Sequence, residues 1–385
     1  MSTTLISFIG RTEKTNDGYR KTNYEIEGTQ YPPSAFLGFK LQAHLQPEKL
    51  IIMGTQGSMW DHLFDGDIHL GTQQEDSRLN LVESVENQTV TQSQLDRLTP
   101  LLSEALQVQV ELQIIPFGQT LEDQIGLLSS MAKHVEPNSN VHLDVTHGFR
   151  SLPMIALLAS MYLREIRDAH IKGIWYGVYD KNMDVTPVHN IHGLLRMADW
   201  LSSMHSYKKD GDYGVFSELL GNEGKNLETA AFYERTSNPI KAKQQLTTWT
   251  SSDQYPDDPI ASLFEDELKA RISWHRAQHR HEYEKHLACE YLNRKDYLRA
   301  AVFGLESKIS ELVYPEKGYD QYNERQVANE TLAKKSKEYK TLRNIRNSLA
   351  HGVRSHDKKI DQLLGNESKL VDELKRLFKV LRILV

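Results

Sequence analysis

The chain has 385 residues, more than one hydrophobic core usually organises, which predicts two domains. Its composition, 39% hydrophobic and 25% charged, is ordinary for a globular protein, and its one cysteine, Cys289, excludes an internal disulfide framework and a cysteine-based zinc site. The N-terminus lacks the basic and apolar regions of a secretion signal, and the longest apolar helix candidate, residues 154–163, has about half the length of a membrane span. We therefore expect a cytoplasmic protein with no membrane partner.

The net charge of −6 is unevenly distributed along the chain. Residues 271–385 carry 24 lysines and arginines against 16 acidic residues, a net of +8, whereas residues 1–270 carry 22 against 36, a net of −14. A basic segment on an acidic protein indicates a polyanion partner for that segment. A solvated basic helical face explains the charge equally well.

Residues 1–190 alternate short β-rich runs with helical stretches. Several of these runs are almost continuously apolar, as expected for strands that are buried on both faces of a parallel sheet. The alternation predicts an α/β domain of the Rossmann-like type. The expected strands are residues 5–9, 50–53, 108–116, 141–145 and 171–179, and the expected helices between them are residues 34–46, 91–106, 121–135 and 152–166.

Two turns of this domain directly follow candidate strands, the places where ligands of open α/β sheets gather. One turn covers residues 54–61 and the other covers residues 146–151. Ser151 and Pro153 predict a capping hydroxyl before the next helix and a proline in its first turn. Because the backbone amides of a helix start can face an anion, the turns predict a site for a phosphate-bearing ligand.

Strand signals fade after residue 190, and the remaining sequence is mainly helical in pattern. From about residue 262 onward the pattern predicts a helical bundle of roughly a hundred residues. The expected elements are a helix over residues 192–206, a polar loop or linker over 237–259, a long helix or helix pair over 286–313, a helix over 334–351 and a final helix over 360–384.

Arg346, Asn347 and His351 lie together on one of these expected helices. Histidine moves protons near neutral pH, arginine stabilises a charged pentacovalent phosphate, and RNA supplies its own 2′-hydroxyl nucleophile, so this set suits RNA cleavage without a metal. Asn347 and His351 share a helix face, but Arg346 and His351 are about 140° apart around a regular helix. A site that uses all three needs a local bend, a frayed helix end or a second copy of the chain. The alternative is that they are ordinary surface residues.

Four histidines precede this motif, namely His275, His279, His281 and His286. The spacing of four residues between His275 and His279 is that of a metal-binding pair on a helix, but no companion carboxylate pattern is present. We expect a solvated, partly basic helix here and no metal site.

The helical segment 289–300, followed by Arg-Asn-x-x-x-His on a later helix, resembles the HEPN ribonuclease domain. The turns over residues 54–61 and 144–151 resemble the signature turns of the CRISPR-associated Rossmann fold, CARF. Together they resemble the type III CRISPR ancillary ribonucleases over most of the chain, least so over residues 200–275. The resemblance implies a CARF domain over residues 1–190, a mostly helical connector over residues 191–275 and an all-α HEPN domain over residues 276–385.

In that family a CARF dimer binds a cyclic oligoadenylate, which activates a composite HEPN site that cleaves single-stranded RNA. The resemblance therefore implies a homodimeric, allosterically activated endoribonuclease of antiviral defence that uses no cofactor; assembly beyond the dimer stays open. Cyclic tetra-adenylate is favoured over cyclic hexa-adenylate as the activator. Arg346 would hold the scissile phosphate, His351 would transfer a proton and Asn347 would orient one of them. A two-fold axis would bring two such sets together.

The resemblance also implies that the ligand is held by the turns that follow three strands. Trp60 or Phe149 would stack on adenine, with packing in the core as the alternative for each. Arg11 would approach a phosphate or else be a solvated loop residue. The expected ligand-binding residues are Gly10, Arg11, Thr55, Gly57, Ser58, Trp60, Thr146, His147, Gly148, Phe149 and Arg150.

Two other functions stay open. A nucleotide-sensing regulator would bind nucleic acid without cutting it, with a helix-turn-helix inside residues 195–275. A CARF domain that slowly cleaves its own activator would use polar groups near the ligand, such as Thr55, Ser58 and Thr146.

Overall fold

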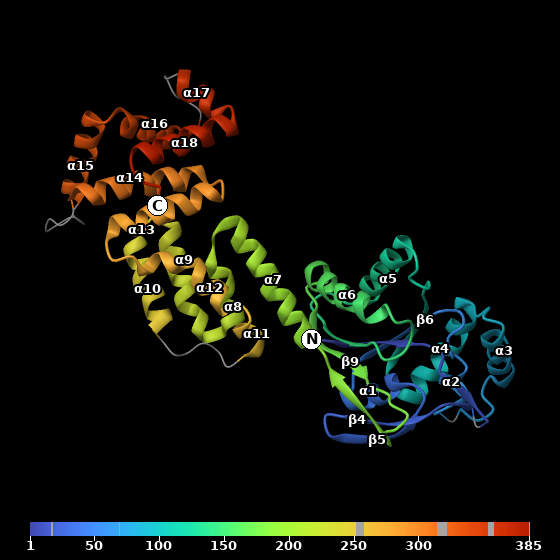
Figure 1. Cartoon of the computed structure of the whole chain (residues 1–385). Coiled ribbons are helices and arrows are strands. Elements are labelled where there is room, and N and C mark those ends of the chain that lie inside the picture. The colour runs from blue at the N-terminus through green and yellow to red at the C-terminus, as the bar shows by residue number, and fades with distance from the viewer. Residues whose placement is uncertain (17, 69, 252–257, 314–321, 353–357, 385) are drawn as a thin grey trace. The chain divides into compact units, whose positions relative to one another are not determined.

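The structure is a computed structural model that describes residues 1–16, 18–68, 70–251, 258–313, 322–352 and 358–384. The chain divides into two compact units, Met1–Leu195 and Arg196–Val385 (Figure 1). The expected connector, residues 191–275, falls mainly in the second unit, where its helices share one hydrophobic core with the helices that follow. None of the described helices combines the length and the apolar character that a membrane crossing requires.

The N-terminal unit is built on an eight-stranded mixed sheet with the order β5-β4-β10-β9-β8-β1-β6-β7. Strand β1 lies between β8 and β6 and runs parallel to both, while β6 pairs in parallel with β7 and β8 pairs in parallel with β9. These five parallel strands confirm the strands expected from the apolar runs. They are β1 (Thr3–Ile9), β6 (Lys49–Gly54), β7 (Gln109–Ile114), β8 (Asn140–Asp144) and β9 (His170–Gly177).

Alternate residues of the parallel strands enter two separate hydrophobic cores. In β1, Leu5 and Ile9 join one core, and Ile6 and Phe8 join the other. Helices α1, α3 and α4 complete the first core and α5 and α6 complete the second, so both faces of the sheet are covered (Figure 1). This Rossmann-like layering explains why the strands are apolar throughout. The helices are α1 (Leu37–Leu45), α3 (Glu75–Glu86), α4 (Gln92–Leu106), α5 (Leu121–His134) and α6 (Leu152–Arg167).

Several strands on the β9 side of the sheet were not predicted from the sequence. Strand β10 is antiparallel to β9, β4 is parallel to β10, and β5 is antiparallel to β4. Their alternating or proline-containing sequences give a weaker signal than the apolar parallel strands, because such strands are only partly buried. The strands are β4 (Thr22–Ile26), β5 (Thr29–Ser34) and β10 (Val185–Asn190), and a hairpin of β2 (Lys14–Thr15) and β3 (Gly18–Tyr19) stands apart from the sheet.

The described part of the C-terminal unit is helical. Residues 286–313, expected as one long helix or a pair, belong to the packed pair α13 (Arg280–Asn293) and α14 (Tyr297–Val313). Helix α16 (Lys337–His351) packs against α14 and against α18 (Glu367–Val380). The other α-helices of this half are α7 (Gly193–Asp210), α8 (Ser217–Leu220), α9 (Lys225–Arg235), α10 (Pro239–Ser251), α11 (Pro259–Ser262), α12 (Glu265–Arg271), α15 (Tyr322–Lys335) and α17 (Lys358–Leu364).

The expected loop over residues 237–259 is wrong for its first half, which forms helix α10. Ala242, Leu246 and Trp249 are all buried on this helix, and their apolar spacing outweighs the polar composition around them. Residues 252–257 of the same stretch lie outside the described residues.

The expected single helix over residues 360–384 is also wrong, because two helices, α17 and α18, occupy this region. Asn366 separates them. Its side chain accepts a hydrogen bond from the Lys369 backbone nitrogen at 3.0 Å and so caps the start of α18. The asparagine and the glycine before it are the sequence signal for the break.

Candidate functional site

The carboxyl ends of β1 and β8 meet at the topological switch point of the parallel sheet. Among the parallel strands, β6 and β7 extend the sheet from one side of β1, and β8 and β9, which come later in the chain, extend it from the other. The turns after β1 and β8 touch, since a Cβ atom on Gly10 would lie 2.6 Å from the backbone nitrogen of Gly148. Gly148 itself has a φ of +111°, which favours glycine. Ligands of open α/β sheets bind in the crevice at such a point.

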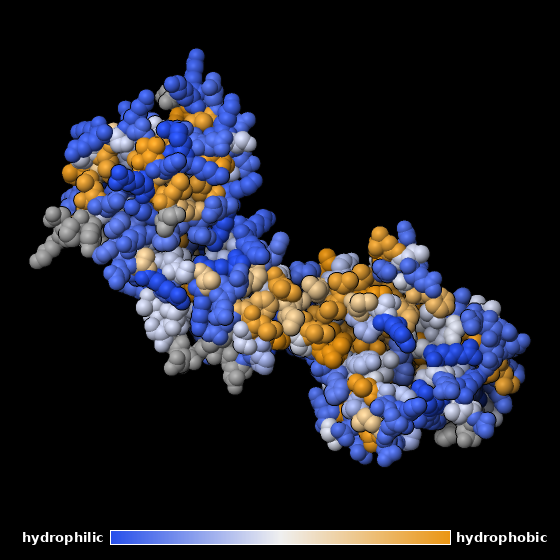
Figure 2. Space-filling model, viewed as in Figure 1, coloured by the Kyte–Doolittle hydropathy of each residue, from blue (hydrophilic) through white to orange (hydrophobic). Residues whose placement is uncertain are grey.

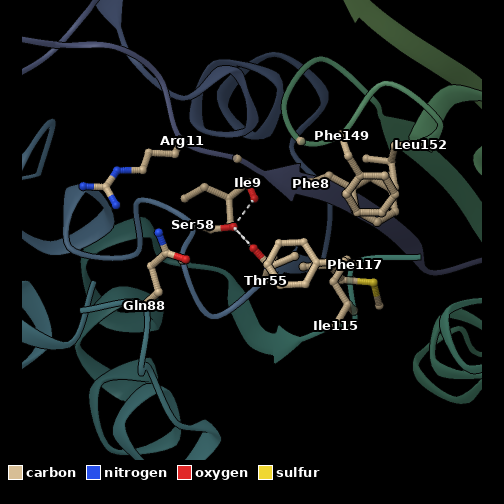
Figure 3. A pocket seen from close by; sticks show the side chains of 15 residues that line it. Phe8, Ile9, Arg11, Thr55, Ser58, Gln88, Ile115, Phe117, Phe149 and Leu152 are labelled. Atoms are coloured by element: carbon tan, nitrogen blue, oxygen red, sulfur yellow. Dashed lines mark hydrogen bonds between the residues drawn. The ribbon is translucent and has the colours of Figure 1, made fainter. Parts of the chain in front are cut away.

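A cavity of about 280 Å³ lies at this switch point (Figure 3). Gln88 and Phe117 also line it, although the sequence analysis did not single them out. Phe117 lies between a proline and a glycine directly after β7, which is the turn signal that would have found it. The expected ligand-binding residues that line this first cavity are Gly10, Arg11, Thr55, Gly57, Ser58, Gly148 and Phe149.

Arg11 lines the first cavity (Figure 3), and the carboxylate of Glu86, which is not one of the lining residues, lies beside it. Its Nη2 lies 3.1 Å from Oε2 of Glu86, and Lys14 also pairs with Glu86. Both cations are therefore partly neutralised by one exposed acid. A phosphate that binds Arg11 must compete with, or rearrange, this ion pair.

The turn after β6 is tied to β1 by Ser58. The Ser58 hydroxyl donates to the carbonyl oxygen of Ile9 at 2.7 Å and accepts from the backbone nitrogen of Thr55 at 3.0 Å. Trp60 is buried, and its indole Nε1 donates to the Thr55 carbonyl oxygen at 2.7 Å. Of the two alternatives for Trp60, packing in the core is therefore the observed one, and stacking on a ligand from this cavity does not fit its position.

Asp144 and Thr146 fix the turn after β8. Asp144 is fully buried and accepts hydrogen bonds from the Ser7 hydroxyl at 2.6 Å and from the Thr146 backbone nitrogen at 3.0 Å. The Thr146 hydroxyl in turn accepts from the backbone nitrogen of Gly177 on β9 at 2.9 Å. The turn is thus anchored to strands on both of its sides, which preorganises its backbone.

Thr146 and His147 border a second cavity, of about 200 Å³, instead of the first. His147 Nε2 accepts a hydrogen bond from the Leu37 backbone nitrogen at 3.1 Å, and burial lowers the pKa of His147 to about 4. The imidazole is therefore neutral at neutral pH and carries its proton on Nδ1. Arg150 is exposed and is not among the residues that line either cavity.

The expected cap at the start of α6 is only partly correct. Pro153 lies in the first turn of the helix, as expected. Ser151, however, has helical backbone angles of φ −77° and ψ −13°, and its side chain makes no capping hydrogen bond. A backbone hydrogen bond from Leu152 to Phe149, at 3.0 Å, leads into the helix instead.

Replacing Gly10 with alanine is expected to destabilise the N-terminal unit and to weaken ligand binding, because the new methyl group would overlap the backbone of Gly148. Overpacking of this kind costs about 1–3 kcal/mol, so the unfolding midpoint should fall by roughly 2–10 °C. Thermal unfolding of the full chain measures the change. Gly126→Ala is the matched control, since no atom lies within 4 Å of its added methyl group; an equal loss there would refute the explanation.

Asp144→Asn is expected to change how stability depends on pH. Burial raises the pKa of Asp144 to about 6, above the unfolded-state value of about 4, so the folded protein holds this proton more tightly. The contribution of Asp144 to stability is therefore greatest below pH 4 and falls by about 2–3 kcal/mol as the pH rises to 6. Urea unfolding of the parent and the variant at several pH values isolates this term. Parallel pH profiles would contradict the assignment.

In the C-terminal unit, Arg346, Asn347 and His351 all lie on α16, which is helical from Lys337 to His351. Arg346 and His351 are thus about 140° apart, and one chain does not bring them onto the same helix face. Asn347 and His351 are exposed, and Gly352, with a φ of +74°, ends the helix. The folded chain therefore keeps Arg346 and His351 on different sides of one helix, as the sequence spacing predicted.

Arg346 is half-buried, and its Nε atom has no hydrogen-bond partner among the described residues although that atom is buried. The neighbouring Arg343, by contrast, pairs with Glu330 at 3.2 Å. Buried donors are normally paired, so the Nε atom of Arg346 is an exception among the described residues.

The four histidines near α13 do not form a ligand set. His275 is buried, and its Nδ1 lies 2.6 Å from the carbonyl oxygen of Ile272, whereas the rings of His279 and His281 stack on each other. Across the described ranges of the chain, no three His, Cys, Asp or Glu side chains come together as a possible metal site.

The sequence of the N-terminal unit matches a known protein family. Residues 4–181 match the family model of the CARF domain of CRISPR system endoribonuclease Csx1. The N-terminal unit is thus similar to a CARF domain, and its Rossmann-like sheet and the cavity at its switch point are consistent with this similarity. Domains of this class bind cyclic oligoadenylates.

One curated relative extends the comparison. The CRISPR-associated protein MJ1674 of Methanocaldococcus jannaschii is 24% identical to this chain over 246 residues, which is 58% of this chain. The chain spans 39% of the length of that relative.

Proposed function

We propose that this protein is an endoribonuclease of type III CRISPR antiviral defence, activated by a cyclic oligoadenylate. In this proposal the CARF domain senses the activator, and a homodimer of the chain cleaves single-stranded RNA with its C-terminal helices, which form a HEPN domain. The observation that carries the proposal is the presence, in one chain, of a CARF switch-point cavity and of Arg346 with His351 on α16.

The cleavage step uses groups that α16 carries. The 2′-oxygen of the RNA attacks the adjacent phosphorus, and the bond from phosphorus to the 5′-oxygen of the next nucleotide breaks. Arg346 neutralises charge on the nonbridging oxygens, and His351 transfers a proton between the reacting oxygens and solvent. Asn347 orients one of these groups. The products are a 2′,3′-cyclic phosphate and a 5′-hydroxyl, and the step needs no metal ion.

A second copy of the chain solves the geometric difficulty on α16. Arg346 of one copy and His351 of the other can face one phosphate across a two-fold axis, although the two residues of one chain diverge around the helix. The proposed site is therefore composite, and it exists only in the dimer.

Helix α6 offers an apolar face that suits contact with such a copy. Four side chains at intervals of four residues are 38–67% exposed, and Figure 2 shows the hydrophobic surface over this helix. Exposed apolar patches of this kind commonly mark interfaces. The residues are Met154, Leu158, Tyr162 and Ile166, and Leu121 and Ile125 of the neighbouring α5 are exposed as well.

An RNA cleavage assay with a panel of activators tests the proposal. Full-length protein is incubated with single-stranded RNA in EDTA, alone or with cyclic tetra-adenylate or cyclic hexa-adenylate. We expect cleavage only with an activator, with the tetra-adenylate the more effective, and products that end in a 2′,3′-cyclic phosphate. RNA that stays intact with every activator, while the protein binds one of them, would refute the nuclease and favour the non-cleaving regulator.

A further inference from the structure

Four lysines surround the corner at which α15 ends and α16 begins (Figure 1). Lys334 and Lys335 lie in the last turn of α15, and Lys337 and Lys340 lie near the start of α16. All four side chains are exposed, and none of them forms an ion pair with a carboxylate of the described residues. These four side chains, which we call the lysine corner, are therefore a cluster of positive charge without counter-charges in the described structure.

The stability of α16 does not explain its two lysines of this corner. The N-terminus of a helix carries partial positive charge, so acidic side chains stabilise the first turn and lysines weaken it. Ser336 caps this helix by accepting a hydrogen bond from the Tyr339 backbone nitrogen at 3.1 Å, and Glu338 is the only acid of the first turn. Lys337 and Lys340 stand on either side of that acid, against the dipole. Residues that break a local stability rule without a compensating contact point to a function.

The lysines of α16 lie on the same side of the helix as two of the proposed catalytic groups. At about 100° per residue, Lys337, Lys340, Asn347 and His351 fall within an arc of about 80°, and this arc contains no acidic residue. A rise of about 1.5 Å per residue separates Lys340 from His351 by about 16 Å along the axis. Because a stacked strand advances about 3.4 Å per phosphate, this separation corresponds to about five nucleotides.

The chemistry of the corner suits the backbone of RNA. A lysine ammonium attracts phosphate as a point charge, and a phosphate contact carries no information about the base. A row of lysines therefore adds affinity for RNA without adding sequence preference. An acidic protein would also be attracted to these charges, but the shared helix face with His351 favours the molecule that the C-terminal unit is proposed to cut.

We propose that the lysine corner is an RNA-binding exosite that holds phosphates about five nucleotides from the one that is cleaved. This assignment rests on the proposed nuclease function and adds to it Lys334, Lys335, Lys337 and Lys340 as positioning residues, which do not touch the reacting atoms. Because an exosite of this kind binds the substrate and the transition state equally well, it lowers KM and leaves kcat unchanged.

Steady-state cleavage of a single-stranded RNA of about 20 nucleotides, with the cyclic adenylate that activates the parent, tests the exosite. The double variant Lys337→Gln/Lys340→Gln should raise KM by about five-fold or more at unchanged kcat. It should also reduce the slope of log(kcat/KM) against log salt by about 1.4, since each phosphate contact on a single strand contributes about 0.7. Lys337→Arg/Lys340→Arg keeps the charges and should behave as the parent does. Lys208→Gln/Lys209→Gln, which removes two exposed charges from α7, is the matched control and should also keep the parent values.

Thermal unfolding separates the exosite from a structural role of the lysines. Because Lys337 and Lys340 oppose the helix dipole, the glutamine variant should unfold at the parent temperature or slightly above it. A lower unfolding temperature together with a lower kcat would show a structural role and overturn the exosite.

The kinetic outcomes separate the exosite from the nuclease function. Parent values of KM and of the salt slope in Lys337→Gln/Lys340→Gln, while the parent cleaves RNA, would overturn the exosite and leave the nuclease standing. An equal rise of KM in the α7 control would show a general effect of charge and would also overturn the exosite. A parent protein that cleaves RNA with no activator of the panel would refute the nuclease and the exosite with it.

Discussion

Replacing His351 with alanine is expected to lower activator-dependent RNA cleavage by about 100-fold to 10,000-fold, the usual contribution of a positioned proton-transfer group. The side chain is exposed at the end of α16, so its removal should leave the fold and the CARF domain unchanged. The initial rate of cleavage of a labelled RNA, measured at saturating activator, gives the ratio directly.

A matched variant makes this result specific. His205 is an exposed histidine on α7, and His205→Ala should cleave RNA at the parent rate. Activator affinity should be the same in both variants, since neither residue lines the cavities of the CARF domain. If His351→Ala cleaves as fast as the parent, the catalytic assignment of α16 is wrong.

Replacing Leu158 with glutamate is expected to break the proposed dimer and, with it, RNA cleavage. Leu158 is 59% exposed in the chain, so the charge is tolerated by the monomer, but burying it unpaired in an interface costs about 3–5 kcal/mol. Dimer affinity should therefore fall by at least 100-fold. Analytical ultracentrifugation over a concentration series measures the change, and the cleavage assay shows its consequence.

Leu79 on α3 provides the control for this variant. It is 61% exposed and lies on a different helix, so Leu79→Glu introduces the same charge without touching the α6 face. We expect it to remain dimeric and active. A Leu158→Glu protein that is monomeric yet fully active would refute the composite site, and one that is still a dimer would show that α6 is not the interface.

The parallel part of the sheet follows from the sequence because its strands are buried on both faces, and double burial demands nearly continuous apolar residues. Strand β10 gives no such signal, since its exposed and buried positions alternate and it contains Pro187. This difference in burial also explains which parts of the candidate site were predicted. The turns after β6 and β8 follow apolar strands and were predicted, whereas β4 and β10, which form walls of the second cavity, were not. Helix α10 was likewise not predicted, because its sequence is mostly polar and its few buried residues are spaced by helical turns.

Sequence alone was sufficient for the local features: which strands are apolar, which turns follow them, and that Arg346 and His351 diverge on a helix. These depend on residue spacing within single elements. Only the tertiary structure decided that Trp60 is a core residue, that the turns of β1 and β8 touch through Gly10 and Gly148, and that Thr146 and His147 face a second cavity. The physical reason is that burial and cavities arise where distant segments pack together, and the spacing of residues along one segment does not encode which neighbour covers it.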